Sequence, residues 1–124
     1  METRRQFYPG RPPIDAYGNG GFRFADMSHR GSLLLLPSGV SGWDVAKRAL
    51  EPKDFEAVFE EGAAVELLIL GTGASLVRPN AAVREAFRSH GMRLEPMDTG
   101  AAARTYNVLL GEGRRVGAAL LAVE

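Results

Sequence analysis

The second half of the chain alternates apolar runs with helix-type patterns, and this alternation restricts the possible fold more than any other feature. The apolar runs are VELLIL at 65–70, MRLEPM at 92–97 and RRVGAALLAV at 114–123. Between them lie PNAAVREAFRSHG at 79–91 and DTGAAARTYNVLLGEG at 98–113, which have the start and stop signals of helices. Strands joined through helices lie parallel in one sheet, with the helices packed against it. The pattern therefore predicts an α/β fold with a mostly parallel central sheet and flanking helices.

The first half of the chain predicts an N-terminal β-hairpin followed by two strands. IDAYG at 14–18 and GFRFAD at 21–26 flank Asn19-Gly20, a dipeptide typical of tight hairpin turns. The four leucines of GSLLLLPSG at 31–39 do not alternate with polar residues, which predicts a strand covered on both faces. SGWDVA at 41–46 predicts a short edge strand that carries the only tryptophan.

A helix and an N-terminal leader complete the predicted organisation. PKDFEAVFEEG at 52–62 begins with a proline, has the apolar spacing of a helix and ends with a glycine. The start, METRRQFYPGRPP, carries arginines without an apolar region behind them, so a secretory signal is not predicted. We expect a flexible leader over residues 1–12 and a single α/β domain over residues 13–124.

Composition excludes several classes of function. The 15 basic and 15 acidic side chains cancel, so the chain has no overall field to attract nucleic acid. Cysteine is absent, which excludes disulfides, thiolate metal sites and a cysteine nucleophile. No apolar run approaches the ~20 residues of a membrane span. The two histidines, His29 and His90, match no metal-ligand pattern, and we expect His29 in a solvated turn. No metal and no cofactor are predicted.

Two glycine-containing loops follow predicted parallel strands, and their strands place them at the same edge of the sheet. These loops are Gly71-Thr72-Gly73 and Asp98-Thr99-Gly100. Ligands of open α/β sheets bind at this edge. The first loop lacks the dinucleotide fingerprint, because Leu76 stands at its third position and Pro79-Asn80 delays the helix. It is either a tight turn that needs positive φ or a cradle for an anion or small ligand.

Three polar side chains near this edge have alternative roles. Asp98 lies in MDTGA, the signature of aspartic proteases, but an alanine-rich helical stretch follows it instead of the all-β fold of those enzymes. A helix N-cap is therefore the favoured role of Asp98. Arg104 and Asn107 are spaced i, i+3 and share one helix face, where Arg104 is either a solvated charge or a contact for an anion or carboxylate.

Four segments of the chain together resemble a small family of unknown function that includes a mitochondrial complex I assembly factor and an adipogenesis-associated relative. They are IDAYGNGGFRF, GSLLLLPSGVSGW, ELLILGTGA and EPMDTGAAARTYNVLLGEGRRVGAALL. The resemblance implies a compact three-layer α/β domain with a central mixed sheet. It implies no established enzymatic activity and supplies no catalytic residues. It further implies a role through protein–protein contacts and, because no mitochondrial leader is evident, a bacterial cytoplasmic protein that works at the membrane face.

Two functional hypotheses follow. The first is a non-enzymatic adaptor or assembly factor that binds a protein partner through exposed aromatic residues, with Tyr17, Phe24 and Trp43 as candidates. The alternative is a small-ligand or anion-binding domain, or a weak enzyme, at the strand-end edge. Its candidate residues are Gly71, Thr72, Gly73, Asp98, Thr99, Arg104 and Asn107. Enzymatic activity stays open, with the non-enzymatic interpretation favoured, and neither the partner nor the oligomeric state is specified.

Overall fold

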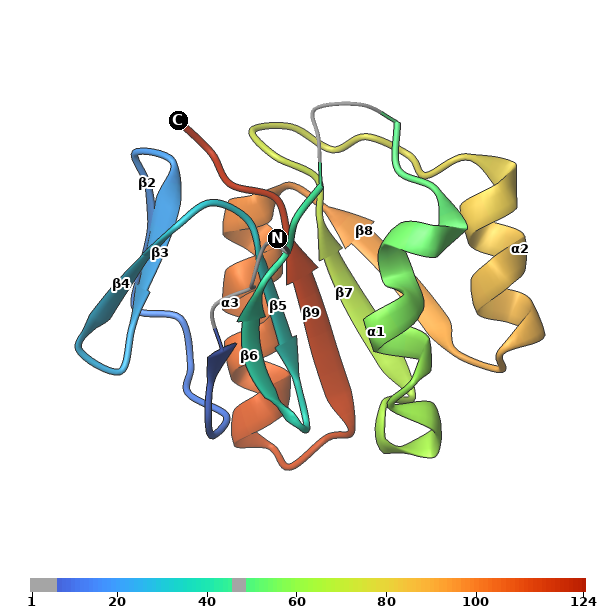
Figure 1. Ribbon diagram of the computed structural model, residues 1–124, viewed down its shortest axis with the longest axis horizontal. Coiled ribbons are helices and arrows are strands. Elements are labelled where there is room, and N and C mark those ends of the chain that lie inside the picture. Colours follow the sequence, from blue (N-terminus) through green and yellow to red (C-terminus); the bar gives the residue numbers. More distant parts are fainter. Residues whose placement is uncertain (1–6, 46–48) are drawn as a thin grey trace, which may run out of the picture.

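The computed structural model describes residues 7–45 and 49–124, which form two sheets and flanking helices (Figure 1). In chain order the elements are β1 (Phe7–Tyr8), β2 (Ala16–Gly18), β3 (Gly21–Phe24), β4 (Met27–Arg30), β5 (Leu33–Leu36), β6 (Gly39–Gly42), the 3₁₀ turn η1 (Pro52–Phe55), α1 (Glu56–Phe59), the 3₁₀ turn η2 (Gly62–Ala64), β7 (Leu67–Gly71), α2 (Ala81–Ser89), β8 (Arg93–Met97), α3 (Thr99–Gly111) and β9 (Val116–Leu120). Within these residues, no helix is both long and apolar enough to cross a bilayer.

The larger sheet is mixed, which confirms the predicted fold class. Its strand order is β1-β6-β5-β9-β7-β8, and β2, β3 and β4 form a separate three-stranded sheet. Strand β7 pairs parallel with both β8 and β9, as the alternation of strands and helices predicts. The other three pairings of the larger sheet are antiparallel, so the parallel share is smaller than expected. The physical reason is that β5 and β6 form a hairpin that adds to β9 from its other side.

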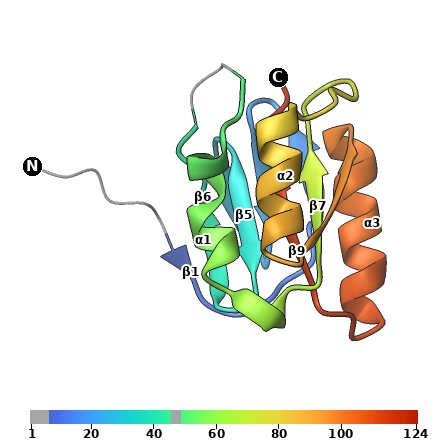
Figure 2. The same ribbon diagram turned by 90° about the vertical axis from the view of Figure 1, so that its right-hand side faces the viewer.

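The molecule has three layers, with the six-stranded sheet in the middle (Figures 1 and 2). Helix α3 and the three-stranded sheet cover one face, and α1 and α2 cover the other. The side chains of β5 show this division: Leu33 and Leu35 belong to the core on the α3 side, and Leu34 and Leu36 to the core on the α1–α2 side. Both faces of β5 are therefore buried, as the run of four leucines predicts.

The predicted hairpin is confirmed, and the structure adds a third strand to it. Asn19 and Gly20 turn the chain with φ of 54° and 81°, the positive values that this dipeptide favours. Residues 27–30 then form β4, so the expectation of a solvated turn at His29 is wrong. His29 is only 7% exposed because its side chain faces the core beside Tyr8. Strand β4 has little signal in the sequence, because Ala25 and Asp26 form the turn before it without a glycine.

The strand expected around Trp43 lies earlier in the chain. Strand β6 covers Gly39–Gly42, and Trp43 follows it with 5% exposure and an Nε1–H that donates to Asp54 O at 2.9 Å. The expected range ended at residue 46, which lies outside the described residues together with 47 and 48. Strand β6 is also not the edge, because β1 pairs with its outer side. That pairing involves only two residues and leaves no periodic pattern in the sequence.

The expected leader contributes to this edge. Its first part, residues 1–6, lies outside the described residues. Phe7 and Tyr8 form β1, and Arg11 Nη2 donates to Val116 O at 3.1 Å. The chain therefore packs on the sheet before residue 13.

The predicted helices form where their end signals place them. Asn80 caps α2 by accepting from Val83 N–H at 2.9 Å, and Gly91 with φ of 67° follows its end. The segment that Pro52 begins starts as a 3₁₀ turn before it becomes α1.

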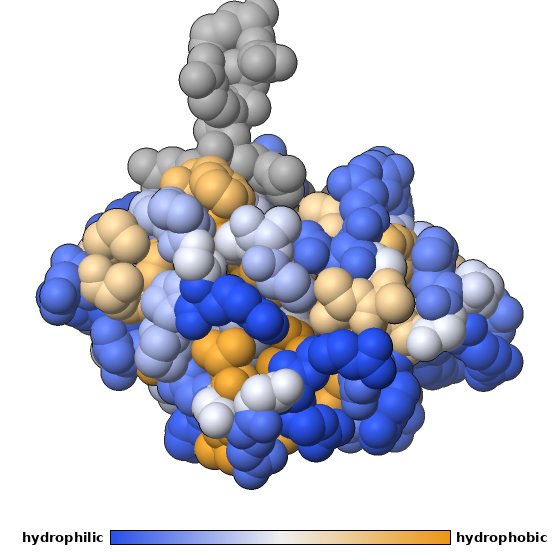
Figure 3. Space-filling view, turned by 90° about the horizontal axis from the view of Figure 1, so that it is seen from below, coloured by the Kyte–Doolittle hydropathy of each residue, from blue (hydrophilic) through white to orange (hydrophobic). Residues whose placement is uncertain are grey.

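The amino ends of β7 and β9 lie at the edge opposite the two glycine-containing loops. Figure 3 shows this lower edge of the molecule. Hydrophilic residues surround a group of apolar residues there. Glu66 joins the two strands by pairing with Arg115 Nη2 at 2.8 Å and Arg114 Nη2 at 3.5 Å. The hydrogen bond and charge of Arg115, supported by Arg114, hold the pKa of Glu66 below its usual value.

Tyr106 on α3 is fully buried, and its hydroxyl has no hydrogen-bond partner among the described residues. Burial raises the pKa of Tyr106, and the charge of the nearby Arg11 guanidinium, which donates to Val116 O and does not reach hydrogen-bond geometry with the hydroxyl, partly offsets this rise.

We predict that Tyr106→Phe leaves the free energy of unfolding unchanged or raises it by up to about 1 kcal/mol, because the Tyr106 hydroxyl makes no hydrogen bond that the variant would lose. Urea unfolding measures this. As a control, Tyr8→Phe removes the 3.1 Å contact of Tyr8 Oη with His29 Nδ1 and should cost about 1 kcal/mol. A similar loss for Tyr106→Phe would contradict the prediction.

Candidate functional site

The two glycine-containing loops lie side by side at the carboxyl ends of β7 and β8, as their strands predict. Thr72 N–H donates to Met97 O at 2.9 Å, and Thr99 N–H donates to Gly73 O at 2.8 Å. The first loop therefore continues the pairing of the sheet beyond the last strand residue and then bonds to the start of α3.

Thr99 holds this edge together through its side chain. It is 0% exposed, and its Oγ1 donates to Leu121 O at 2.7 Å while it accepts from Gly73 N–H at 2.9 Å. One hydroxyl therefore links the loop after β7, the residue after β9 and the first turn of α3. The hydroxyl both donates and accepts a hydrogen bond, and these two bonds offset the free-energy cost of burying it.

The glycines of the first loop meet steric and conformational demands. A Cβ atom on Gly71 would lie 2.9 Å from both Thr99 Oγ1 and Leu120 Cδ2. Gly73 has φ of 101°, which side chains disfavour. Because the amides of Thr72 and Gly73 already bond within the chain, an anion would have to break these bonds to use them.

Thr72 shapes the rest of this loop. Its Oγ1 donates to Ser75 O at 2.7 Å and accepts from Val77 N–H at 2.9 Å. The loop is thus closed on itself, and it presents Leu76 and Val77 to solvent with 61% and 58% exposure.

Asp98 caps α3, as its position predicts. Its Oδ1 accepts from Ala101 N–H at 2.9 Å, and its backbone is extended as in other N-caps. The carboxylate also favours the positive end of the helix. Among residues 7–45 and 49–124, no three His, Asp or Glu side chains come together as potential metal ligands.

A shallow groove of about 340 Å³, here called the seam groove, lies between α3 and the chain leading into β2. Its lining includes Asp15, Tyr17, Gly100, Ala103, Arg104 and Asn107. The structure thus brings together Tyr17, a partner-binding candidate, with Arg104 and Asn107 from the ligand-binding candidates. Gly71 and Thr72 are not in this lining.

Two contacts form the walls of the seam groove. Asn107 accepts from Ile14 N–H and donates to Ile14 O, both at 2.8 Å, so its amide pairs with the backbone as a strand would. Tyr17 lies over Gly100, where a Cβ atom would be only 2.3 Å from Tyr17 Oη. Through these contacts, Asn107 and Gly100 join α3 to β2 and the segment before it. Arg104 is exposed and forms no ion pair among the described residues.

The other two aromatic candidates are not exposed, which corrects the expectation of exposed anchors at these positions. Phe24 is 0% exposed because β3 turns it toward the core, and Trp43 is 5% exposed because it packs against Phe55. Tyr17 is 44% exposed. Of the three, only Tyr17 offers a surface to a partner.

The match to known proteins extends over nearly the whole fold. Residues 14–121 match the model of a family described as a protein of unknown function, DUF498/DUF598. The chain belongs to the DUF498/DUF598 family. The match begins just before β2 and ends just after β9, so it includes both loops and the seam groove.

Relatives of this DUF498/DUF598 chain include bacterial and mitochondrial proteins. An uncharacterized protein of Rhodobacter capsulatus is 40% identical over 98% of this chain and 93% of its own length. The mouse NADH dehydrogenase (ubiquinone) 1 alpha subcomplex assembly factor 3 is 32% identical over 92% of this chain. The chain spans only 62% of that relative's length. The predicted family and its complex I assembly factor are confirmed, whereas the adipogenesis-associated relative stays a prediction.

Solved structures share the fold of this family member. A crystal structure described as an outer membrane protein from Bartonella henselae superposes with a TM-score of 0.91 and is 50% identical. It covers 94% of this chain and 99% of the other.

We predict that Thr99→Val destabilises the protein by about 1–3 kcal/mol, because Gly73 N–H loses its buried acceptor and Leu121 O its donor. Thr99→Ser keeps the hydroxyl and should cost only about 1 kcal/mol for the lost methyl group. Urea unfolding at an unchanged m-value compares the two variants. A loss for Thr99→Ser that equals or exceeds the loss for Thr99→Val would contradict the prediction, because the hydroxyl would then contribute no more than the methyl group.

Proposed function

We propose that this protein is a non-enzymatic, assembly-factor-like adaptor that acts by binding a protein partner. The observation that carries the proposal is the 32% identity, over 92% of this chain, with a protein named as a respiratory-complex assembly factor. A bacterial cytoplasmic location, with the partner at the membrane face and no nucleic-acid ligand, belongs to the same proposal.

The seam groove is the surface that we assign to this partner. Tyr17 and Arg104 belong to the residue types most enriched among binding hot spots. Both are exposed, and rigid elements position them: Tyr17 rests on Gly100, and Arg104 projects from the second turn of α3. The open shape of the groove suits a protein surface better than an enclosed small molecule.

The alternative is a small-ligand or anion site, or a weak enzyme, at Gly71-Thr72-Gly73 and Asp98-Thr99-Gly100. It receives less support, because Thr72 N–H, Gly73 N–H and Thr99 Oγ1 already bond within the chain. Asp98 is likewise engaged at the helix start.

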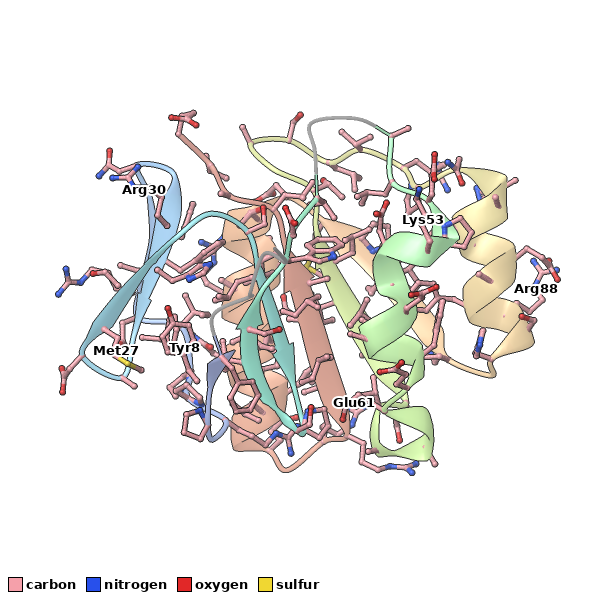
Figure 4. The ribbon with its side chains drawn as sticks, in the orientation of Figure 1. Tyr8, Met27, Arg30, Lys53, Glu61 and Arg88 are labelled. Carbon is pink, nitrogen blue, oxygen red and sulfur yellow. The ribbon has the colours of Figure 1, made fainter. Side chains whose placement is uncertain are left out.

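Affinity purification tests the adaptor proposal. Tagged protein from detergent-solubilised membranes of its native cells should enrich respiratory-complex subunits over an untagged control, as measured by quantitative mass spectrometry. Arg104→Glu should lower this enrichment about tenfold or more, the effect of losing an interface anchor. Lys53→Glu is the matched control, because Lys53 is exposed on the opposite layer (Figure 4). Absence of enrichment, or equal loss in both variants, would refute the proposal.

Amide NMR shifts test the alternative directly. We predict that inorganic phosphate and nucleotides at millimolar concentration leave the Gly73 and Thr99 amides unshifted, because both already donate within the chain. Saturable shifts at these two amides would instead establish a ligand site at the strand-end edge.

A further inference from the structure

A second groove lies on the other layer, between α2 and the edge strand β8. This α2–β8 groove has a volume of about 360 Å³. Its floor is apolar and includes Phe87, Met92 and Leu94, of which Phe87 and Met92 are 1% and 6% exposed. Its rim carries the arginines Arg78, Arg84 and Arg88, and its lining contains no acidic residue. Three positive charges around an apolar recess are a local feature of a chain with zero net charge.

The three guanidinium groups are available for a ligand. Arg78 pairs with no carboxylate among the described residues. Arg84 Nη1 makes only a long contact with Pro79 O at 3.4 Å. Arg88 points outward from α2 (Figure 4) and pairs with Glu85 at 3.1 Å, but both side chains are largely exposed, so this pair contributes little.

The free edge of β8 indicates how a partner would bind. Arg93 N–H bonds to Glu66 O, and Met97 O accepts from Thr72 N–H, so the backbone N–H and C=O groups of the odd-numbered residues point toward β7. The backbone groups of Leu94 and Pro96 therefore point away from the sheet, and Pro96 has no N–H to donate. A proline at this position leaves Leu94 N–H as the outward donor of β8 and disfavours the pairing of an added strand. This favours recognition through side chains in the groove.

The loop before the groove adds an exposed apolar surface. Leu76 and Val77 directly precede Arg78 and are more than half exposed. Thr72 Oγ1 holds this loop closed, so the two side chains are presented in a fixed position. Exposed apolar groups beside positive charges are typical of a binding surface.

We propose that the α2–β8 groove binds an acidic segment of a partner protein, with an apolar side chain in the recess and flanking carboxylates on the arginines. Arginine pairs with carboxylates through two parallel hydrogen bonds, which gives such a site geometric selectivity. The inference deepens the proposed function and rests on it, since it names the chemistry of a partner at a second surface. A recess favours a peptide over an anionic membrane, because a bilayer surface cannot insert a single side chain into it.

The test is a titration of the full-length labelled protein with a synthetic peptide that has glutamates on both sides of one leucine. We expect saturable amide shifts at Arg84, Phe87 and Leu94, and affinity that falls as salt rises. The double variant Arg78→Gln, Arg84→Gln should weaken binding at least about tenfold. Arg93→Gln is the matched control: it removes one arginine from β8, but on the face toward α3, and should leave binding unchanged.

The inference is overturned if the groove shows no saturable shift, or if a version of the peptide with glutamines in place of glutamates binds equally well. It is also overturned if the double variant and Arg93→Gln lose equal affinity. Shifts without peptide that grow with protein concentration would instead assign the groove to a second copy of this chain. Shifts with anionic vesicles but not with the peptide would assign it to a membrane. Each leaves the enrichment experiment with Arg104→Glu unaffected, so failure here is distinguishable from failure of the proposed function.

Discussion

The hydrogen bonds of the buried Thr99 hydroxyl are the interactions on which the strand-end edge of the sheet depends. They join the loop after β7 to the residue after β9, at the point where α3 begins. A Cβ atom on Gly71 would meet this same hydroxyl, so the position of Thr99 requires a glycine at 71. A chain that uses its strand-end loops this way stabilises the sheet edge, where many α/β proteins instead leave amides free for a phosphate. Because the polar groups of this edge are already bonded, the exposed surfaces beside it are the better candidates for binding.

Two such surfaces lie on opposite layers of the sheet. The seam groove forms where α3 meets the three-stranded sheet, and the α2–β8 groove forms where α2 meets the sheet edge. Both carry exposed arginines: Arg104 projects from α3, whereas Arg84 and Arg88 project from α2 and Arg78 from the loop before it. An adaptor needs to hold two partners, or two parts of one partner, in a fixed relation. Two arginine-bearing grooves separated by a rigid sheet have the geometry for that role, which is consistent with the proposed function.

The fold was predictable where its signals are local. Asp98 and Asn80 cap helices through contacts with residues three positions later, and Asn19-Gly20 sets its own turn. The misses depend on distant contacts. Strand β4 follows a turn of Ala25 and Asp26, whose positive φ has no glycine signal, and β1 forms only because β6 lies beside it. Such pairings arise from packing between segments that no window of sequence contains.

The candidate site shows the same limit at the level of single side chains. The i, i+3 spacing placed Arg104 and Asn107 on one helix face, yet it could not distinguish their roles. The side-chain amide of Asn107 forms two hydrogen bonds with the backbone of Ile14, 93 residues away in the chain. It thereby holds the segment that leads into β2 against α3. That pairing creates the groove in which Arg104 remains exposed. Asn107 thus shapes the surface that we propose for binding, and Arg104 is the side chain that we assign to the contact with a partner.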